Sequence, residues 1–189
     1  AEAGNPAVDH REAFLHAHRN FLQKTVHAGE AYGPESIFQA LTECHADRIG
    51  HGTFLFHADK VTQHVADPER FVERLAESIA HRRICVEVNL TSNLQTLPEL
   101  NEISEHPLGN MIRHNLSATL CTDNRLVSHT TVTREFELAV EHFGLEIGQV
   151  RNLVVAGFKG AFFPGTYREK RQFVRDAIDH IRKLEASLI

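Results

Sequence analysis

Short apolar runs alternate along the chain with longer segments whose apolar residues recur at helical spacing. The runs suit short strands, which we expect at Thr25–Val26, Asp47–Ile49, Ile84–Val88 and Ala118–Thr122. Each strand is followed by a helical segment, so strand–helix units lie near residues 24–44, 47–82, 84–115 and 118–143. This alternation predicts an α/β fold with a parallel sheet and helices packed outside it.

Helical patterns also flank these units. Further helices are expected at Asp9–Asn20, Ile147–Phe162 and Tyr167–Leu188. Asp9 suits an N-cap, Thr53–Asp67 fits a loop or a broken helix, and Asn89–Asn93 fits a polar turn. No repeat or linker divides the sequence, so we expect residues 1–189 to form a single domain.

Polar residues stand where each predicted strand ends: His27 with Glu30, His51, Ser92 with Asn93, and Asp123 with Asn124. Because the carboxyl ends of parallel strands share one edge of a sheet, these groups should converge there. An imidazole and a carboxylic acid at such a place can supply a metal ligand and a proton donor. Ser92 and Asn93 fit a side-chain-to-backbone turn better than substrate contacts.

Composition excludes several classes of protein. No apolar run approaches the roughly 20 residues that span a bilayer, and the first residues lack the pattern of a signal peptide. The net charge of -5, the scattered Lys and Arg residues and the absence of Trp argue against binding of nucleic acid. Cys44, Cys85 and Cys121 form no Cys-x-x-Cys pair. They fit buried free thiols of a reducing compartment, so we expect a cytoplasmic protein.

Four motifs carry a resemblance to a known family: His27-Ala-Gly-Glu30, Arg48-Ile-Gly-His-Gly52, Leu90-Thr-Ser-Asn93 and Cys121-Thr-Asp-Asn124. In this order the chain, from residue 1 to about residue 165, resembles the adenosine deaminase family of zinc-dependent (β/α)8-barrel enzymes, which are related to the amidohydrolases. The resemblance implies a TIM-type barrel, of which this chain supplies the last four strand–helix units and the C-terminal helices.

The resemblance also implies roles for individual residues. His27 and Asp123 would ligate one zinc ion per complete site, and Glu30 would be the protonated acid that donates to purine N1. His51 would orient or deprotonate the water on the metal, and Gly29 would contact substrate. The family usually has a second Asp at the position of Asn124. An amide NH2 can still donate to purine N7, so Asn124 is expected to bind substrate.

The implied activity is hydrolytic deamination of adenosine and 2′-deoxyadenosine to inosine and ammonia in purine salvage. The family's first strand, which ends in a His-x-His pair, and the Gly at the end of its fourth strand have no counterpart in this sequence. We therefore expect the chain to be a C-terminal half that is inactive alone and pairs with an N-terminal half of the same protein. Two alternatives stay open: a deaminase of another 6-aminopurine compound, and a non-catalytic half-barrel that acts as an interaction module.

Overall fold

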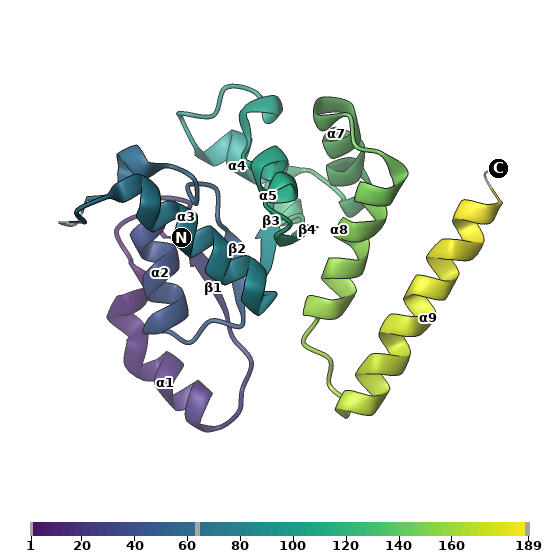
Figure 1. Cartoon of the computed structure of the whole chain (residues 1–189), viewed down its shortest axis with the longest axis horizontal. Helices are drawn as coiled ribbons and strands as arrows, with labels where there is room; N and C mark the ends of the chain where they lie inside the picture. Colours follow the sequence, from purple (N-terminus) through teal and green to yellow (C-terminus); the bar gives the residue numbers. More distant parts are fainter. Residues whose placement is uncertain (1, 63–64, 188–189) are drawn as a thin grey trace.

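The computed structural model describes residues 2–62 and 65–187. Its sheet has four parallel strands in the order β1-β2-β3-β4 (Figure 1). The strands are β1 (Thr25–Ala28), β2 (Arg48–His51), β3 (Cys85–Val88) and β4 (Ser117–Leu120). All neighbouring pairs are parallel, and Val26 lies opposite Ile49, which lies opposite Val86. The expected α/β fold with a parallel sheet is therefore confirmed.

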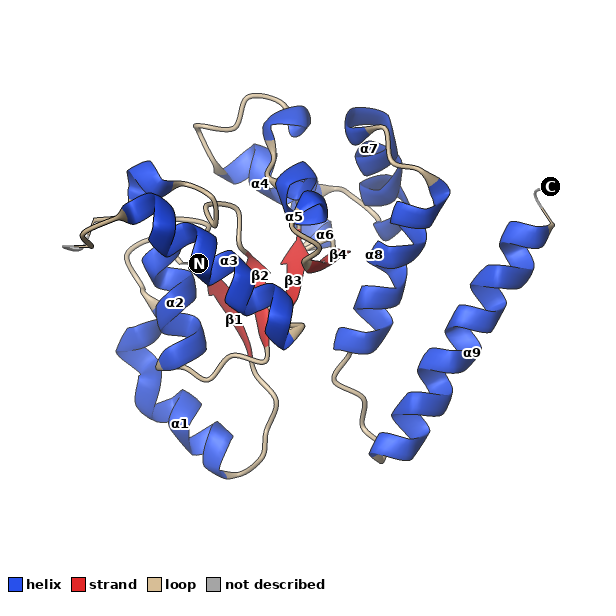
Figure 2. Cartoon of the chain, in the orientation of Figure 1, coloured by secondary structure: helices blue, strands red, loops and turns tan. Residues whose placement is uncertain are grey.

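Helices connect and follow the strands (Figure 2). The α-helices are α1 (Arg11–Arg19), α2 (Pro34–Thr42), α3 (Pro68–Arg82), α4 (Leu90–Thr96), α5 (Leu108–Arg113), α6 (Arg125–Ser128), α7 (Val132–Phe143), α8 (Ile147–Gly160) and α9 (Tyr167–Ala186). Short 3-10 helices occur at η1 (Ala7–His10), η2 (Ala58–Lys60) and η3 (Ile103–Glu105). None of the helices in the described part of the chain has the length and apolar character needed to cross a membrane.

One face of the sheet carries the main core. Side chains alternate between the two faces of a strand. The buried aliphatic residues at alternate strand positions are Val26, Ala28, Ile49, Val86, Val88, Ala118 and Leu120. Ile37 of α2, Ile79 of α3 and Met111 of α5 belong to the same buried cluster. Burying one such side chain stabilises the fold by about 1.5–3 kcal/mol. The following helices thus cover the outer face, as the strand–helix pattern predicts.

The opposite, inner face of the sheet is polar and is covered in part by α8, which Figure 1 shows on the other side of the sheet from α2 and α3. Arg48 and Glu87 form an ion pair there, with 2.6 Å between Nε and Oε1. Arg48 also donates from NH1 to the carbonyl of Gly160 at 3.3 Å, and its guanidinium lies 3.7 Å from the centroid of the Phe162 ring. The end of α8 is therefore tied to this face.

Several local expectations are wrong. Asn89–Asn93 is not a turn, because α4 begins at Leu90. Asp9 is not an N-cap: it lies in η1, and α1 begins after His10. Of the three thiols, Cys44 and Cys85 are buried, whereas Cys121 is partly exposed. Leu188, the expected end of the last helix, lies outside the described residues.

Candidate metal and substrate site

The site is built at the carboxyl ends of β1 and β2. His27 lies on β1 with its side chain toward the inner face, one residue before the strand ends. Gly50, its partner on β2, makes room for it, because a Cβ at Gly50 would lie 2.9 Å from Cδ2 of His27. His51 is the last residue of β2 and is 1% exposed.

Three of the predicted residues form one cluster. Ligand atoms of His27, Glu30 and His51 all lie within 4.8 Å of one another. The two imidazole rings meet edge to face with 4.8 Å between centroids, and Nε2 of His51 lies 3.5 Å from Oε2 of Glu30. Among the described residues, no other group of three or more histidines, cysteines or acids is placed closely enough to hold a metal ion.

Unusual backbone conformations bring these groups together. His51 and Asp123 have φ values of 68° and 51°, in the left-handed region that side chains disfavour. Such a residue costs about 1–3 kcal/mol and persists only where its surroundings fix it, often at functional sites. Gly29 has φ 72°, and a Cβ there would lie 2.6 Å from Cδ1 of Ile37. Gly29 is therefore required by the turn itself, and its N–H donates to Ser36 Oγ at 2.8 Å.

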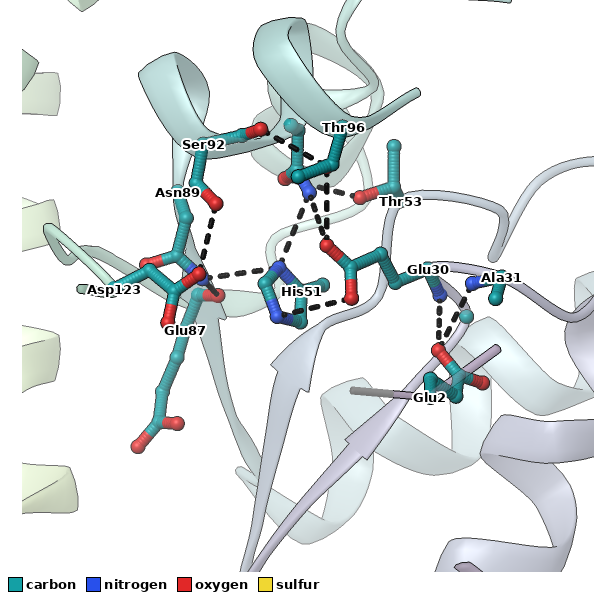
Figure 3. A network of polar contacts seen from close by, with 12 residues as sticks. Glu2, Glu30, Ala31, His51, Thr53, Glu87, Asn89, Ser92, Thr96 and Asp123 are labelled. Atoms are coloured by element: carbon teal, nitrogen blue, oxygen red, sulfur yellow. Dashed lines mark hydrogen bonds and ion pairs between the residues drawn. The ribbon is translucent and has the colours of Figure 1, made fainter. Parts of the chain in front are cut away.

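Glu30 is buried within a hydrogen-bonded loop (Figure 3). The backbone N–H groups of Glu30 and Ala31 donate to Oε2 of Glu2 at 2.8 and 3.0 Å. At the other end of the side chain, Oε1 of Glu30 lies 3.2 Å from Oγ1 of Thr96 and accepts from Nδ2 of Asn93 at 3.4 Å. The carboxyl group is thus held in one orientation, with Oε2 toward His51.

Asp123 and Asn124 follow β4 and are both exposed. In Figure 3, Asp123 lies on the side of His51 away from Glu30, and its Oδ2 accepts from Oγ of Ser92 at 2.8 Å. The side-chain oxygen of Asn124 accepts from the N–H of Val127 at 3.3 Å and caps α6. The amide NH2 is therefore the group of Asn124 that suits a ligand.

The structure shows contacts that the sequence did not indicate. Asn93, expected in a turn, is fully buried on α4 and contacts both His51 and Glu30. His106 is buried, and its Nε2 lies 3.2 Å from Oδ1 of Asn93. Asn89 also contacts His51, with 3.2 Å between Nδ2 and Nδ1. Ser92 holds Asp123, so it too belongs to the site rather than to a turn.

Burial controls the electrostatics of the two innermost histidines. Burial lowers the pKa of His51, although the carboxylate of Glu30 opposes this effect. Burial, with a smaller contribution from His51, lowers the pKa of His106 to about 3. Both rings are therefore favoured in the neutral form, which is the form that accepts hydrogen bonds and ligates metals.

The donor atoms suit zinc in kind. Imidazole nitrogen and carboxylate oxygen are common zinc ligands, and a catalytic zinc site generally has three protein ligands. The exposed side chains of His27 and Asp123 offer one of each at the rim of the site. The two residue types suit a zinc ion, but Asp123 is not part of the cluster of His27, Glu30 and His51. Two protein ligands also leave the ligand set of a zinc ion incomplete.

Comparison with solved structures identifies the fold. The chain superposes with a TM-score of 0.77 on an amidohydrolase from Burkholderia ambifaria that was crystallised with bound Zn, at 24% identity over 99% of this chain and 49% of that one. An N6-mAMP deaminase from Arabidopsis superposes with a TM-score of 0.68, at 28% identity over 90% of this chain and 45% of that one. The protein is thus an α/β chain with the fold of about half of an amidohydrolase-type TIM barrel.

Sequence comparison then gives the family. The pattern of the family described as Adenosine deaminase matches residues 1–181. "Adenosine deaminase 1" of Streptomyces coelicolor is 41% identical over 178 residues, which are 94% of this chain and 43% of that protein. The chain belongs to the adenosine deaminase family. It spans about half the length of the curated relatives that it matches.

Proposed function

We propose that this chain supplies the C-terminal half of a zinc-dependent deaminase that converts adenosine and 2′-deoxyadenosine to the inosine nucleosides and ammonia. The observation that carries the proposal is the cluster of His27, Glu30 and His51, whose ligand atoms lie within 4.8 Å of one another. Membership of the adenosine deaminase family supports the reaction class. The expected residue order also agrees with the strand order, because His27 and His51 lie at the ends of β1 and β2, and Glu30 and Asp123 follow β1 and β4.

His27 and Asp123 are the residues that would hold the metal. Both are exposed at the rim of the site, and Ser92 orients the Asp123 carboxylate by a hydrogen bond of 2.8 Å. A zinc ion held there would supply a Lewis acid that lowers the pKa of water to about 7. Two protein ligands are too few for a tight site, so further ligands must come from elsewhere.

The remaining residues act on the purine and on water. Glu30 donates a proton to N1, which makes C6 more electrophilic, and His51 orients the water that attacks C6. Water forms the new C–O bond at C6; one of its protons goes to N6 and the other restores the Glu30 acid, and the C6–N6 bond breaks so that ammonia leaves. The Asn124 amide donates to N7, and Gly29 lets the chain approach the base closely.

We further propose that an N-terminal half is needed to complete the site. In residues 2–62 and 65–187 the sheet has four strands with β1 and β4 at its edges, whereas a TIM barrel closes with eight strands. The matched relatives are about twice as long as this chain. In this proposal residues 1–189 are one half of a single barrel domain, and this half alone is inactive.

A panel assay tests the proposal. The protein completed by an N-terminal half is loaded with Zn2+ and given adenosine, 2′-deoxyadenosine, adenine or AMP, and ammonia release is measured. Turnover of the two nucleosides with about one bound zinc per site supports the proposal. Glu30→Gln should lower kcat by about 100-fold or more, while the exposed Glu77→Gln on α3 serves as the control. If the completed protein binds no zinc and turns over none of the four compounds, the chain is a non-catalytic half-barrel instead.

A nucleotide substrate is the second candidate. Asn124 stands where the family usually has an acid, and the Arabidopsis protein that is 28% identical to this chain is an N6-mAMP deaminase. A neutral amide beside the base removes one negative charge from the site, and a substrate phosphate then meets less repulsion. Faster turnover of AMP than of adenosine in the same panel would favour this candidate.

A further inference from the structure

Asn93 connects parts of the site that come from different segments of the chain. It lies on α4 and is fully buried. Its Nδ2 approaches Oε1 of Glu30 at 3.4 Å and Nδ1 of His51 at 3.1 Å. Its Oδ1 accepts from Oγ1 of Thr53 at 3.1 Å and lies 3.2 Å from Nε2 of His106. The direction of these hydrogen bonds therefore decides where the protons of the site lie.

The backbone fixes that direction through His106. Nδ1 of His106 lies 3.1 Å from the backbone N–H of Leu108, which can only donate, so Nδ1 must carry a lone pair. A neutral imidazole then carries its proton on Nε2, and the atom of Asn93 that faces Nε2 must be the oxygen. The side-chain amide of Asn93 consequently cannot flip by exchanging its oxygen and nitrogen. Its NH2 group is therefore directed at His51 and Glu30.

A second backbone group fixes the other neighbour of His51. Nδ2 of Asn89 donates to the carbonyl of Glu87 at 3.1 Å, so the atom of Asn89 that lies 3.2 Å from Nδ1 of His51 is also an NH2 donor. Nδ1 of His51 thus faces two amide donors, Asn89 and Asn93 (for Asn89 see Figure 3). A hydrogen on Nδ1 would point at the hydrogens of both NH2 groups, which disfavours the tautomer protonated at Nδ1.

We propose that Asn93, anchored by His106, is a positioning residue that holds the proton of His51 on Nε2 and directs it toward Oε2 of Glu30. The functional meaning of this inference rests on the proposed roles of Glu30 and His51. With a proton on Nε2 and donors on Nδ1, His51 has no lone pair available to remove a proton from water. When water binds beside Glu30, the same Nε2–H is the group with which His51 can orient it, so His51 donates to water and does not act as a general base.

Nitrogen NMR of the histidine rings tests the inference in this chain without any turnover. In 15N-labelled protein at a fixed pH near 7, long-range 1H–15N correlations distinguish the protonated ring nitrogen from the unprotonated one. His51→Gln and His106→Gln each remove one set of signals and so assign the two rings. We expect both rings to show a single tautomer with the proton on Nε2. A proton on Nδ1 of His51 in the wild-type chain would overturn the proposal.

Variants at His106 separate positioning from simple packing. His106→Leu removes the donor to Oδ1 of Asn93, so the Asn93 amide can flip. The His51 ring should then become a mixture of its two neutral tautomers. His106→Gln retains a side-chain NH2 near the place of Nε2 and should restore the single tautomer. Thr53→Val removes the other donor to the same oxygen and is the matched control, which should leave His51 unchanged. An unchanged His51 in a folded His106→Leu chain would contradict the inference.

The two proposals fail in different ways. If the completed protein turns over no aminopurine while His51 keeps its Nε2 proton, the proposed function fails and the positioning role of Asn93 stands. If turnover is found while His51 carries its proton on Nδ1, the positioning role fails and the function stands.

Discussion

At the scale of single residues, the site depends on polar side chains that touch no substrate in the proposed reaction. Ser92 holds Asp123 by a hydrogen bond of 2.8 Å, and Asn93 holds Glu30 and His51. Residues that orient metal ligands often matter nearly as much as the ligands, since an exposed carboxylate has many rotamers without them.

Ser92→Ala should weaken zinc binding. Without the Ser92 hydroxyl, Asp123 must order itself when the metal binds, and losing such a partner lowers metal affinity by about 10–100-fold. The measurement is zinc affinity of the completed protein by competition with a chelator. Ser104→Ala is the control, because Ser104 is exposed and contacts only Glu102 among the polar contacts described. Equal affinity of the two variants would show that Ser92 does not support the metal ligand.

His106 should make stability depend on pH. Its pKa is lowered from 6.5 to about 3 because the ring is buried. Below pH 6.5 the unfolded chain takes up a proton that the folded chain excludes, so stability is full above pH 6.5 and is lost as the pH falls toward 3. The loss is about 1.4 kcal/mol for each pH unit well below 6.5. Urea unfolding at pH 7, 6 and 5 measures it.

The controls for this prediction lie in the same hydrogen-bond network. His106→Gln keeps a donor to Asn93 but cannot titrate, so its stability should fall less steeply with acid than that of the wild type. Thr53→Val removes a hydrogen bond to Asn93 without removing a titratable group, so it should keep the wild-type slope. Identical slopes for the wild type and His106→Gln would mean that His106 is protonated in the folded chain.

At the scale of elements, the close contact of α8 with the inner face depends on glycine. A Cβ at Gly160 would lie 2.8 Å from Cβ of Cys85 on β3, a distance at which one of the backbones must move. At Gly148, near the start of the same helix, the nearest atom to a Cβ would be 3.7 Å away, at the end of Arg151. The two positions offer the same substitution in different surroundings.

Gly160→Ala and Gly148→Ala should therefore change stability in opposite directions. Overpacking at Gly160 should destabilise the chain by about 1–3 kcal/mol. Gly148→Ala should stabilise it by about 0.5–1 kcal/mol, because Ala loses less backbone entropy in a helix. Urea unfolding measures the unfolding free energy of both variants, with one common slope of free energy against urea concentration. Stabilisation by both variants would mean that α8 does not press against β3 in solution.

The strands and the longer helices follow from the sequence, but α4 does not. Asn89 to Asn93 has Asn, Thr and Ser, which compete with the backbone for hydrogen bonds and favour turns. Glu135 of α7 accepts hydrogen bonds from Thr91 and stabilises the helix by tertiary contacts that no local pattern contains. One signal was available: Leu90, Leu94 and Leu97 repeat at helical spacing.

The sequence predicts which strand-end side chains converge at the site, but it does not predict which of them act by holding another residue. His27 and His51 lie at the ends of β1 and β2, and Glu30 follows β1, so the parallel arrangement brings them together. Asn93 and His106 meet only because the loop after α4 folds back over the site. Likewise, the apolar residues of α8 predict a helix, but they do not state which face of the sheet it covers.

At the scale of the whole molecule, two thiols lie beneath different parts of the fold. Cys44 belongs to the core under the outer helices, whereas Cys85 lies on the inner face, with its Sγ 3.9 Å from the Ala156 carbonyl of α8. Burial raises the pKa of Cys85 to about 12 and also raises the pKa of Cys44. Because the thiolate is the reactive form, each should react with a thiol reagent only after the structure around it opens.

These thiols test whether the chain unfolds as a single domain. If residues 1–189 form one cooperative unit, Cys44 and Cys85 should become reactive through the same opening, with a free energy equal to that of global unfolding. The experiment measures labelling rates at pH 8 in increasing urea for two variants, Cys85→Ala with Cys121→Ala and Cys44→Ala with Cys121→Ala, each of which retains one buried thiol. The urea dependence of each rate gives the surface exposed in the opening. A lower opening free energy at Cys85 than at Cys44 would mean that α8 and α9 detach separately from the sheet, and the expectation of a single domain would then be wrong.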